Sequence, residues 1–314
     1  MKRREFLAAA AALASTAGAS RLLAQSATPA GRAKQSTLDR IAIMTLNFQR
    51  LLKLPDLPQE PERTLELFDV PEMIADKYGV HKIEFQHYHI PSTEPSFLKE
   101  LRAQIEKRKS RMTQINLEFG QLNMSAPELR NRLMAIDLTK MWVDHAAMLG
   151  AQRVMINQGQ PTQENKSYGI PTLKTMADYG RSKGIIVSVE TRGGGGGRGR
   201  GTATDATTPP PPPPPPGPVV WSLLSEIIKA AGAYSNVDVG GANAANQDEL
   251  HACLRTMFPM TAGSMHTRVN ARWDLATAIR FLEGELGYKG LYTIEASNGH
   301  EGTQPIYDVV VATL

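Results

Sequence analysis

Short apolar runs alternate with longer amphipathic segments from residue 38 to the end of the chain. The short runs are rich in β-branched and aromatic residues, whereas the longer segments repeat their apolar residues at helical spacing. The pattern predicts eight strands, within residues 40–48, 81–90, 111–120, 151–159, 184–190, 235–241, 261–270 and 290–297. A helical segment follows each predicted strand.

Strands that alternate with helices of this length predict parallel pairing through βαβ crossovers. Eight such units match a single (β/α)8 TIM barrel, which we expect over residues 38–314 after a linker at 27–37. An open doubly wound α/β sheet is the competing architecture. It usually has a G-x-G-x-x-G motif after its first strand, where this sequence reads IMTLNFQR.

Glycine, arginine and proline repeats fill residues 193–218, between the fifth predicted strand and its helix. Such segments cannot bury enough apolar surface to offset the entropy of ordering. A linker between two domains would leave five strand–helix units on one side and three on the other, and neither set closes a barrel. We therefore expect one domain with a disordered, low-complexity insertion in the fifth βα loop.

The chain begins MKRREFLAAAAALASTAGAS, a paired arginine followed by an alanine-rich apolar segment. This stretch resembles a twin-arginine (Tat) export signal, which we place at residues 1–26. The apolar segment is shorter than the roughly 20 residues that span a bilayer, so we expect no stable membrane anchor. The Tat export machinery is thus an expected partner, and the periplasm or the exterior the expected location.

The formal net charge of +4 gives little reason to expect an anionic macromolecular partner. Three of those charges belong to the predicted signal, and the repeat RGGGGGRGRG has no aromatic residues between its arginines. Binding to nucleic acid is therefore not expected. Cys253 is the single cysteine, which excludes a disulfide within the chain.

Four candidate metal ligands stand at or near the ends of the last four predicted strands: Glu190, Asp238, His266 and Glu295. The carboxyl ends of the strands carry the chemistry in TIM barrels, and neighbouring strands lie about 4.8 Å apart. The four side chains can therefore converge on one point. Three carboxylates and a neutral imidazole suit one divalent ion, Mn²⁺, Mg²⁺, Co²⁺ or Zn²⁺. Taken singly, a carboxylate there could cap a helix, and a histidine could be a hydrogen-bonded structural residue.

This order of residues, with the ending GYKGLYTIEAS and its helix, resembles the xylose-isomerase-like TIM-barrel superfamily of sugar phosphate isomerases and epimerases. The resemblance covers residues 40–314. It implies a carbohydrate substrate and proton abstraction next to a carbonyl through an enediolate, with Glu190 and Glu295 as catalytic residues as well as ligands. It also implies a substrate pocket lined by His87, His89, Asn116, Glu118, Asn157 and Arg268.

Two positions depart from the pattern of that superfamily. Many of its members carry a histidine three residues after the aspartate of strand six, where this chain has Gly241. Arg268, two residues after the strand-seven histidine, could bind a carboxylate or phosphate of a substrate, or pair with Asp274. The alternation in HYH places His87 and His89 on one face of the second strand, where both could face the pocket.

The same metal and carboxylates allow a second reaction class. A metal-dependent lyase or hydrolase could act on glycosides or oxidised sugars, since elimination also begins with a proton removed next to a carbonyl. A third reading is a non-catalytic sugar-binding barrel. The sequence leaves a homo-oligomer open.

Overall fold

The computed structural model describes residues 33–55, 60–119, 123–156, 159, 161–191, 220–242 and 244–314. Three features predicted from the sequence lie outside the described residues: the export signal, the low-complexity insertion and Asn157. Contacts group residues Ser36–Leu314 into one unit.

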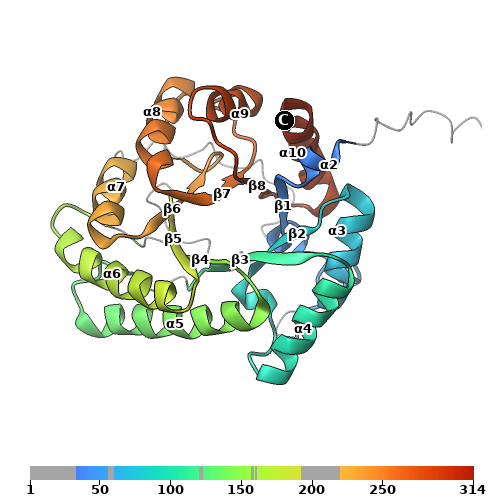
Figure 1. The fold of residues 1–314 in the computed structure, drawn as a ribbon, viewed down its shortest axis with the longest axis horizontal. Helices are drawn as coiled ribbons and strands as arrows, with labels where there is room; N and C mark the ends of the chain where they lie inside the picture. Colours follow the sequence, from blue (N-terminus) through green and yellow to red (C-terminus); the bar gives the residue numbers. More distant parts are fainter. Residues whose placement is uncertain are drawn as a thin grey trace, which may run out of the picture. The chain divides into compact units, whose positions relative to one another are not determined.

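Eight parallel strands close into a barrel in sequence order, as Figure 1 shows. The strands are β1 (Ile41–Met44), β2 (Lys82–Gln86), β3 (Arg111–Leu117), β4 (Arg153–Ile156), β5 (Ile186–Glu190), β6 (Tyr234–Asp238), β7 (Thr261–Thr267) and β8 (Leu291–Ile294). The ring closes between β8 and β1, where Ala42 pairs with Thr293. The predicted (β/α)8 barrel is therefore confirmed, and the open doubly wound sheet is excluded.

Helices surround the strands on the outside of the barrel (Figure 1). The α-helices are α2 (Gln35–Leu38), α3 (Val70–Tyr78), α4 (Pro95–Lys107), α5 (Leu129–Leu149), α6 (Lys166–Ser182), α7 (Val220–Ala231), α8 (Gln247–Met257), α9 (Leu275–Gly284) and α10 (Gly299–Thr313). Short 3-10 turns are η1 (Thr45–Phe48), η2 (Leu67–Asp69), η3 (His87–His89) and η4 (Phe258–Met260). Over the described ranges, no helix has both the length and the apolarity needed to cross a membrane.

Local sequence signals set the ends of several helices. The carboxylate of Asp274 accepts a hydrogen bond from the backbone N–H of Thr277, 2.7 Å away, and so caps the first turn of α9. Asn246 caps α8 in the same way. Helix α5 ends at Leu149, and the next residue, Gly150, has a φ of 76°, the left-handed conformation that glycine adopts without a Cβ clash.

The strands are buried on both faces, but the two faces differ in chemistry. In β2, Ile83 and Phe85 alternate with Glu84 and Gln86, and all four are buried. The polar face points into the barrel, where Glu84 on β2 meets His266 on β7 at 3.0 Å. The interior of the barrel thus holds a layer of hydrogen-bonded polar side chains, while the apolar face packs under the helices.

The second strand is shorter than its sequence pattern predicted. It ends at Gln86, and the next three residues form the 3-10 turn η3. Residues two apart in such a turn point about 240° from each other, so they do not share a face. The prediction that His87 and His89 alternate along one strand face is therefore wrong.

Candidate metal centre

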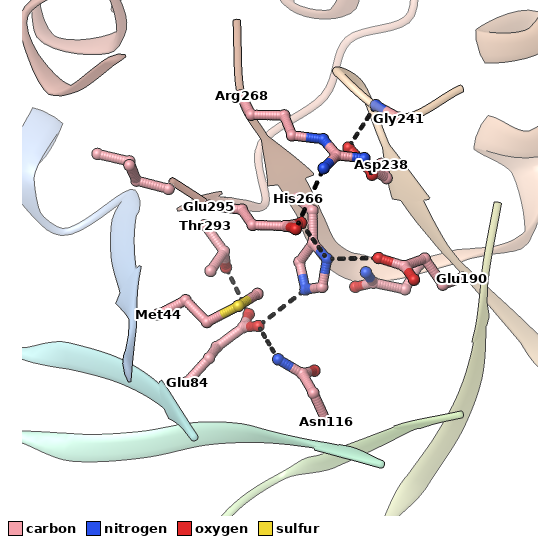
Figure 2. Close-up of polar contacts among 12 residues, drawn as sticks. Met44, Glu84, Asn116, Glu190, Asp238, Gly241, His266, Arg268, Thr293 and Glu295 are labelled. Carbon is pink, nitrogen blue, oxygen red and sulfur yellow. Dashed lines mark hydrogen bonds and ion pairs between the residues drawn. The ribbon is translucent and has the colours of Figure 1, made fainter. Parts of the chain in front are cut away.

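Three buried side chains meet at the carboxyl ends of β5, β7 and β8. The Nδ1 atom of His266 lies 3.0 Å from Glu190 Oε1 and 3.3 Å from Glu295 Oε2 (Figure 2). One ligand atom from each residue lies within 4.8 Å of the other two. The backbone fixes this arrangement, because the N–H of Glu295 continues the β7–β8 pairing by donating to the carbonyl of Thr267.

A fourth buried carboxylate, Glu84 on β2, holds the other side of the His266 ring. Glu84 Oε2 lies 3.0 Å from His266 Nε2 (Figure 2). Four further side chains donate hydrogen bonds to this carboxylate, those of Ser264, Thr293, Gln114 and Asn116. Glu84 is thereby fixed in place by side chains from three other strands.

These contacts determine the protonation of His266. Burial alone would lower its pKa, but hydrogen bonds with Glu190, Glu295 and Glu84 outweigh burial and raise the pKa well above 6.5. Burial would raise the pKa of Glu84, yet the charge and hydrogen bond of His266 bring it below its usual value. Glu84 is therefore ionised and accepts the Nε2 proton, which leaves Nδ1 facing the two glutamates.

Asp238 at the end of β6 lies beside this group, but its carboxylate is held by other partners. Its Oδ2 accepts from Arg268 Nη2 at 2.6 Å, and its Oδ1 accepts from the backbone N–H of Gly241 at 2.7 Å (Figure 2). Nη1 of Arg268 also lies 3.4 Å from Glu295 Oε1. Asp274, the alternative partner considered for Arg268, caps α9 and lies 3.6 Å from Arg280.

The pKa of Asp238 rises to about 6. Burial is the main cause, and the negative charges of Glu295 and Glu190 add to it, whereas Arg268 acts in the opposite direction. One guanidinium at 2.6 Å thus does not compensate fully for the burial of several carboxylates at the same end of the barrel. A further cation among these groups would stabilise the ionised form.

The donors fit a divalent ion in charge and in spacing. Two cationic or protonatable side chains, His266 and Arg268, stand against four buried carboxylates: Glu84, Glu190, Asp238 and Glu295. Two ligands that share one ion at bond lengths of about 2.0–2.2 Å lie about 3.0–3.4 Å apart. The separations of 3.0 and 3.3 Å around His266 Nδ1 match that range. Glu190, His266 and Glu295 could therefore hold one metal ion.

The two histidines predicted to line the substrate pocket lie in different surroundings. His89 is buried, its Nδ1 lies 2.8 Å from the hydroxyl of Thr45, and its Nε2 has no hydrogen-bond partner within the described part of the chain. Burial lowers its pKa to about 3. His87 packs against Phe119 and Trp142, with ring centroids 4.5 and 5.5 Å away. Only His89 belongs to the polar layer beside β1.

The other three described residues that were predicted to contact the substrate, Asn116, Glu118 and Arg268, lie in different places. Asn116 lies inside the barrel, where its side chain hydrogen-bonds with Glu84 and Gln114. Glu118 lies beside His87 and donates its backbone N–H to the ring at 3.2 Å. Arg268 reaches the centre directly, through Asp238 and Glu295. A contact of any of these residues with a substrate stays a prediction.

Five polar residues of the barrel interior were not assigned a role from the sequence: Glu84, Gln114, Asn236, Ser264 and Thr293. Each stands two positions before a polar residue near the end of its own strand, as Ser264 does before His266 and Thr293 before Glu295. Residues two apart in a strand share a face. That spacing was the available signal, and it extends the polar face one layer deeper into the barrel.

The sequence matches no protein-family model, and the comparison with curated proteins gives no significant match. Solved structures do share its fold. A xylose isomerase domain protein from Planctomyces limnophilus superposes with a TM-score of 0.60 at 14% identity, over 87% of this chain and 94% of that one.

Two sugar epimerases superpose equally well. D-psicose 3-epimerase from Clostridium cellulolyticum H10, solved with D-tagatose, has a TM-score of 0.61 at 13% identity, over 86% of this chain and 89% of that one. For 3-keto-D-glucoside 4-epimerase from E. coli the TM-score is 0.60 at 12% identity, over 88% of this chain and 100% of that one. The chain thus has the fold of xylose-isomerase-like barrels, among them sugar epimerases.

Proposed function

We propose that this protein is an exported, divalent-metal-dependent isomerase or epimerase of a sugar or sugar derivative. One observation carries the proposal: two buried glutamates, Glu190 and Glu295, flank a single imidazole nitrogen at the carboxyl end of the barrel. That end is where TIM-barrel enzymes bind their substrates. The fold shared with two sugar epimerases supports the choice of a sugar over other substrates.

The reaction is a proton transfer at a carbon next to a carbonyl. A bound divalent ion supplies stabilisation of the negative charge that develops on the substrate oxygens. One of the two glutamates accepts the proton, the electron pair of the broken C–H bond forms the C=C bond of the enediolate, and the π pair of the carbonyl moves onto its oxygen. For epimerisation the other glutamate, protonated when the substrate binds, donates its proton to the opposite face of the same carbon. For isomerisation the neighbouring carbon receives the proton, and a second proton passes from its hydroxyl to the former carbonyl oxygen.

Other side chains keep the two glutamates and the histidine in position. Glu84 accepts the Nε2 proton of His266, so this tautomer presents the lone pair of Nδ1 to the ion when the ring is neutral. Arg268 lies near one oxygen of Glu295, while the other oxygen of that carboxylate faces His266. The polar layer in the barrel therefore orients the groups that would carry the chemistry.

Solvent exchange tests the proposed reaction. The purified protein, supplied with Mn²⁺ or Co²⁺ in deuterated water, should incorporate deuterium next to the carbonyl of a ketose or keto-sugar, and Glu190→Gln should abolish the incorporation. Mass spectrometry separates the outcomes, because an isomer retains the mass of the substrate apart from deuterium and an elimination product loses water or a leaving group. Absence of exchange with every keto-sugar in a representative panel would contradict the proposal.

Export is tested separately from catalysis. Replacing Arg3 and Arg4 together by lysine should retain the protein in the cytoplasm of a host with a working twin-arginine pathway, because that pathway reads the arginine pair. Cell fractionation of the wild type and the variant measures the difference. Equal amounts of both in the periplasm would contradict the assignment of the signal.

A further inference from the structure

The pairing of Asp238 with Arg268 has a consequence for the metal, and it rests on the metal-dependent function proposed above. Asp238 stands at the end of β6, in the place from which its carboxylate could join Glu190, His266 and Glu295. Both of its oxygens are engaged instead, one by the Arg268 guanidinium and one by the backbone of Gly241. Asp238 is also absent from the group of close donors found among the described residues.

The loop after β6 is shaped to admit the guanidinium. A Cβ at Gly241 would lie 1.8 Å from Asp238 Oδ2 and 2.1 Å from Arg268 Nη2. A Cβ at Gly240 would lie 2.0 Å from Arg268 Cγ. Two consecutive residues without side chains thus provide the volume that Arg268 fills, and no other residue type fits at either position without displacing it.

The same loop is tied to the segment that carries Arg268. The side-chain amide of Asn270 donates to the carbonyl of Gly240 at 2.6 Å. The backbone N–H of Asp238 donates to the hydroxyl of Thr191 at 3.1 Å, which fixes the start of the loop on the neighbouring strand end. The Arg268 side chain is three-quarters buried, with 25% of its surface exposed, and the Asp238 carboxylate is fully buried. Separating an ion pair buried to this extent is costly, because each charge would stay buried without a partner of opposite charge.

We infer that the ion is held by three protein ligands, Glu190, His266 and Glu295, and that Arg268 withholds Asp238 from it. Two carboxylates and a neutral imidazole balance the charge of a divalent cation. A third carboxylate as ligand would add a negative charge, which the guanidinium instead neutralises at 2.6 Å. Three protein ligands also leave coordination positions for substrate oxygens, as in catalytic metal sites. Arg268 is thus a positioning residue that acts through Asp238 and Glu295.

A double substitution tests the inference. Asp238→Asn with Arg268→Gln removes both charges of the pair and keeps groups that can hydrogen-bond to each other. Calorimetric titration of metal-stripped protein with Mn²⁺ should give one ion per chain for the wild type and for the double variant, with dissociation constants within about tenfold of each other. Glu190→Gln and Glu295→Gln, which remove ligands, should each weaken binding by about 100-fold or more.

A double variant that loses Mn²⁺ as severely as Glu295→Gln would overturn the inference while leaving the metal-dependent function in place. A wild type that binds no ion would overturn both. Circular dichroism establishes that the double variant is folded. Should it not fold, a crystal structure of the wild type with Mn²⁺ decides: the inference requires Asp238 Oδ2 on Arg268, and a bond between Asp238 and the ion refutes it.

Discussion

Glu84 and the pair Glu190 and Glu295 lie on opposite sides of one imidazole ring, and their surroundings differ. Glu84 lies deep in the barrel, where hydroxyl and amide donors from neighbouring strands fix it along with the ring. Glu190 and Glu295 lie at the carboxyl end and converge on Nδ1 with a spacing that a metal ion matches. Buried carboxylates of the same type thus divide into one that is held within the barrel by hydrogen bonds and two that could hold a metal ion.

Substitution of Glu190 or Glu295 is expected to have the largest effect, a loss of catalytic rate. Glu190→Gln or Glu295→Gln should lower the rate of solvent exchange by about 10²–10⁴-fold, because a general acid–base group is lost. Each variant keeps two of the three carboxylates around His266, so the imidazolium retains a buried counter-charge and the protein should stay folded. Glu301→Gln, an exposed glutamate in α10, is the matched control and should exchange at the wild-type rate.

Substitution of Glu84 should instead lower the stability of the fold. Glu84→Gln should lower the free energy of unfolding of the metal-free protein by about 3–5 kcal/mol, because it breaks the buried pair with His266 and an amide cannot accept every hydrogen bond that neighbouring side chains donate to this carboxylate. Denaturant unfolding measures the change. Glu283→Gln removes the partly exposed carboxylate that pairs with Arg40 and should cost less. A Glu84→Gln protein as stable as the wild type would show that the two sides of the ring do not differ in this way.

His89, a buried histidine of the barrel, should make the folded protein less stable in acid. His89 has a hydroxyl partner, and burial lowers its pKa to about 3. Between pH 6.5 and about 3 the unfolded chain therefore binds a proton at this residue that the folded chain does not. The contribution of His89 to stability is complete above pH 6.5 and is lost as the pH falls, by at most about 1.4 kcal/mol per pH unit.

Unfolding at pH 7, 6, 5 and 4 measures that loss. His89→Gln should remove this part of the pH dependence, while the part due to His87, whose pKa burial lowers to about 4, stays. An identical slope in the variant and the wild type would show that His89 is not held neutral by the fold.

The smallest loss of stability is expected from a substitution outside the barrel interior, at Asp274. Asp274→Ala removes the cap of α9 and should lower the free energy of unfolding by about 1 kcal/mol. Its Mn²⁺ affinity should equal that of the wild type, because Asp274 takes no part in the centre. A changed affinity would mean that the first turn of α9 and the metal centre are coupled.

The spacing of apolar residues predicted the fold, because strands and helices each have a characteristic spacing. All eight strands and the helices after them lie where the alternation of short apolar and long amphipathic segments placed them, and eight units are what a closed barrel needs. The errors lie at strand ends. Residues 87–89 follow β2 with strand-like composition, yet form a 3-10 turn, because the local pattern does not encode where pairing with β3 stops.

The convergence of Glu190, His266 and Glu295 was predictable because strand ends in a parallel barrel meet at one end. The partners of Asp238 were not, since they depend on the room left by Gly241 and on a guanidinium from a different strand. Glu84 was assigned no role because it lies one layer below the strand ends, where a lone carboxylate between Ile83 and Phe85 gives no sign of the histidine 182 positions later.

Metal analysis of the protein as purified tests the central claim most directly. The wild type should carry one divalent ion per chain, and His251→Ala, which alters a histidine stacked on Phe281 outside the centre, should carry the same amount. His266→Ala should lose the ion, because it removes the nitrogen on which both glutamates converge. Equal metal content in His266→Ala and the wild type would contradict the account.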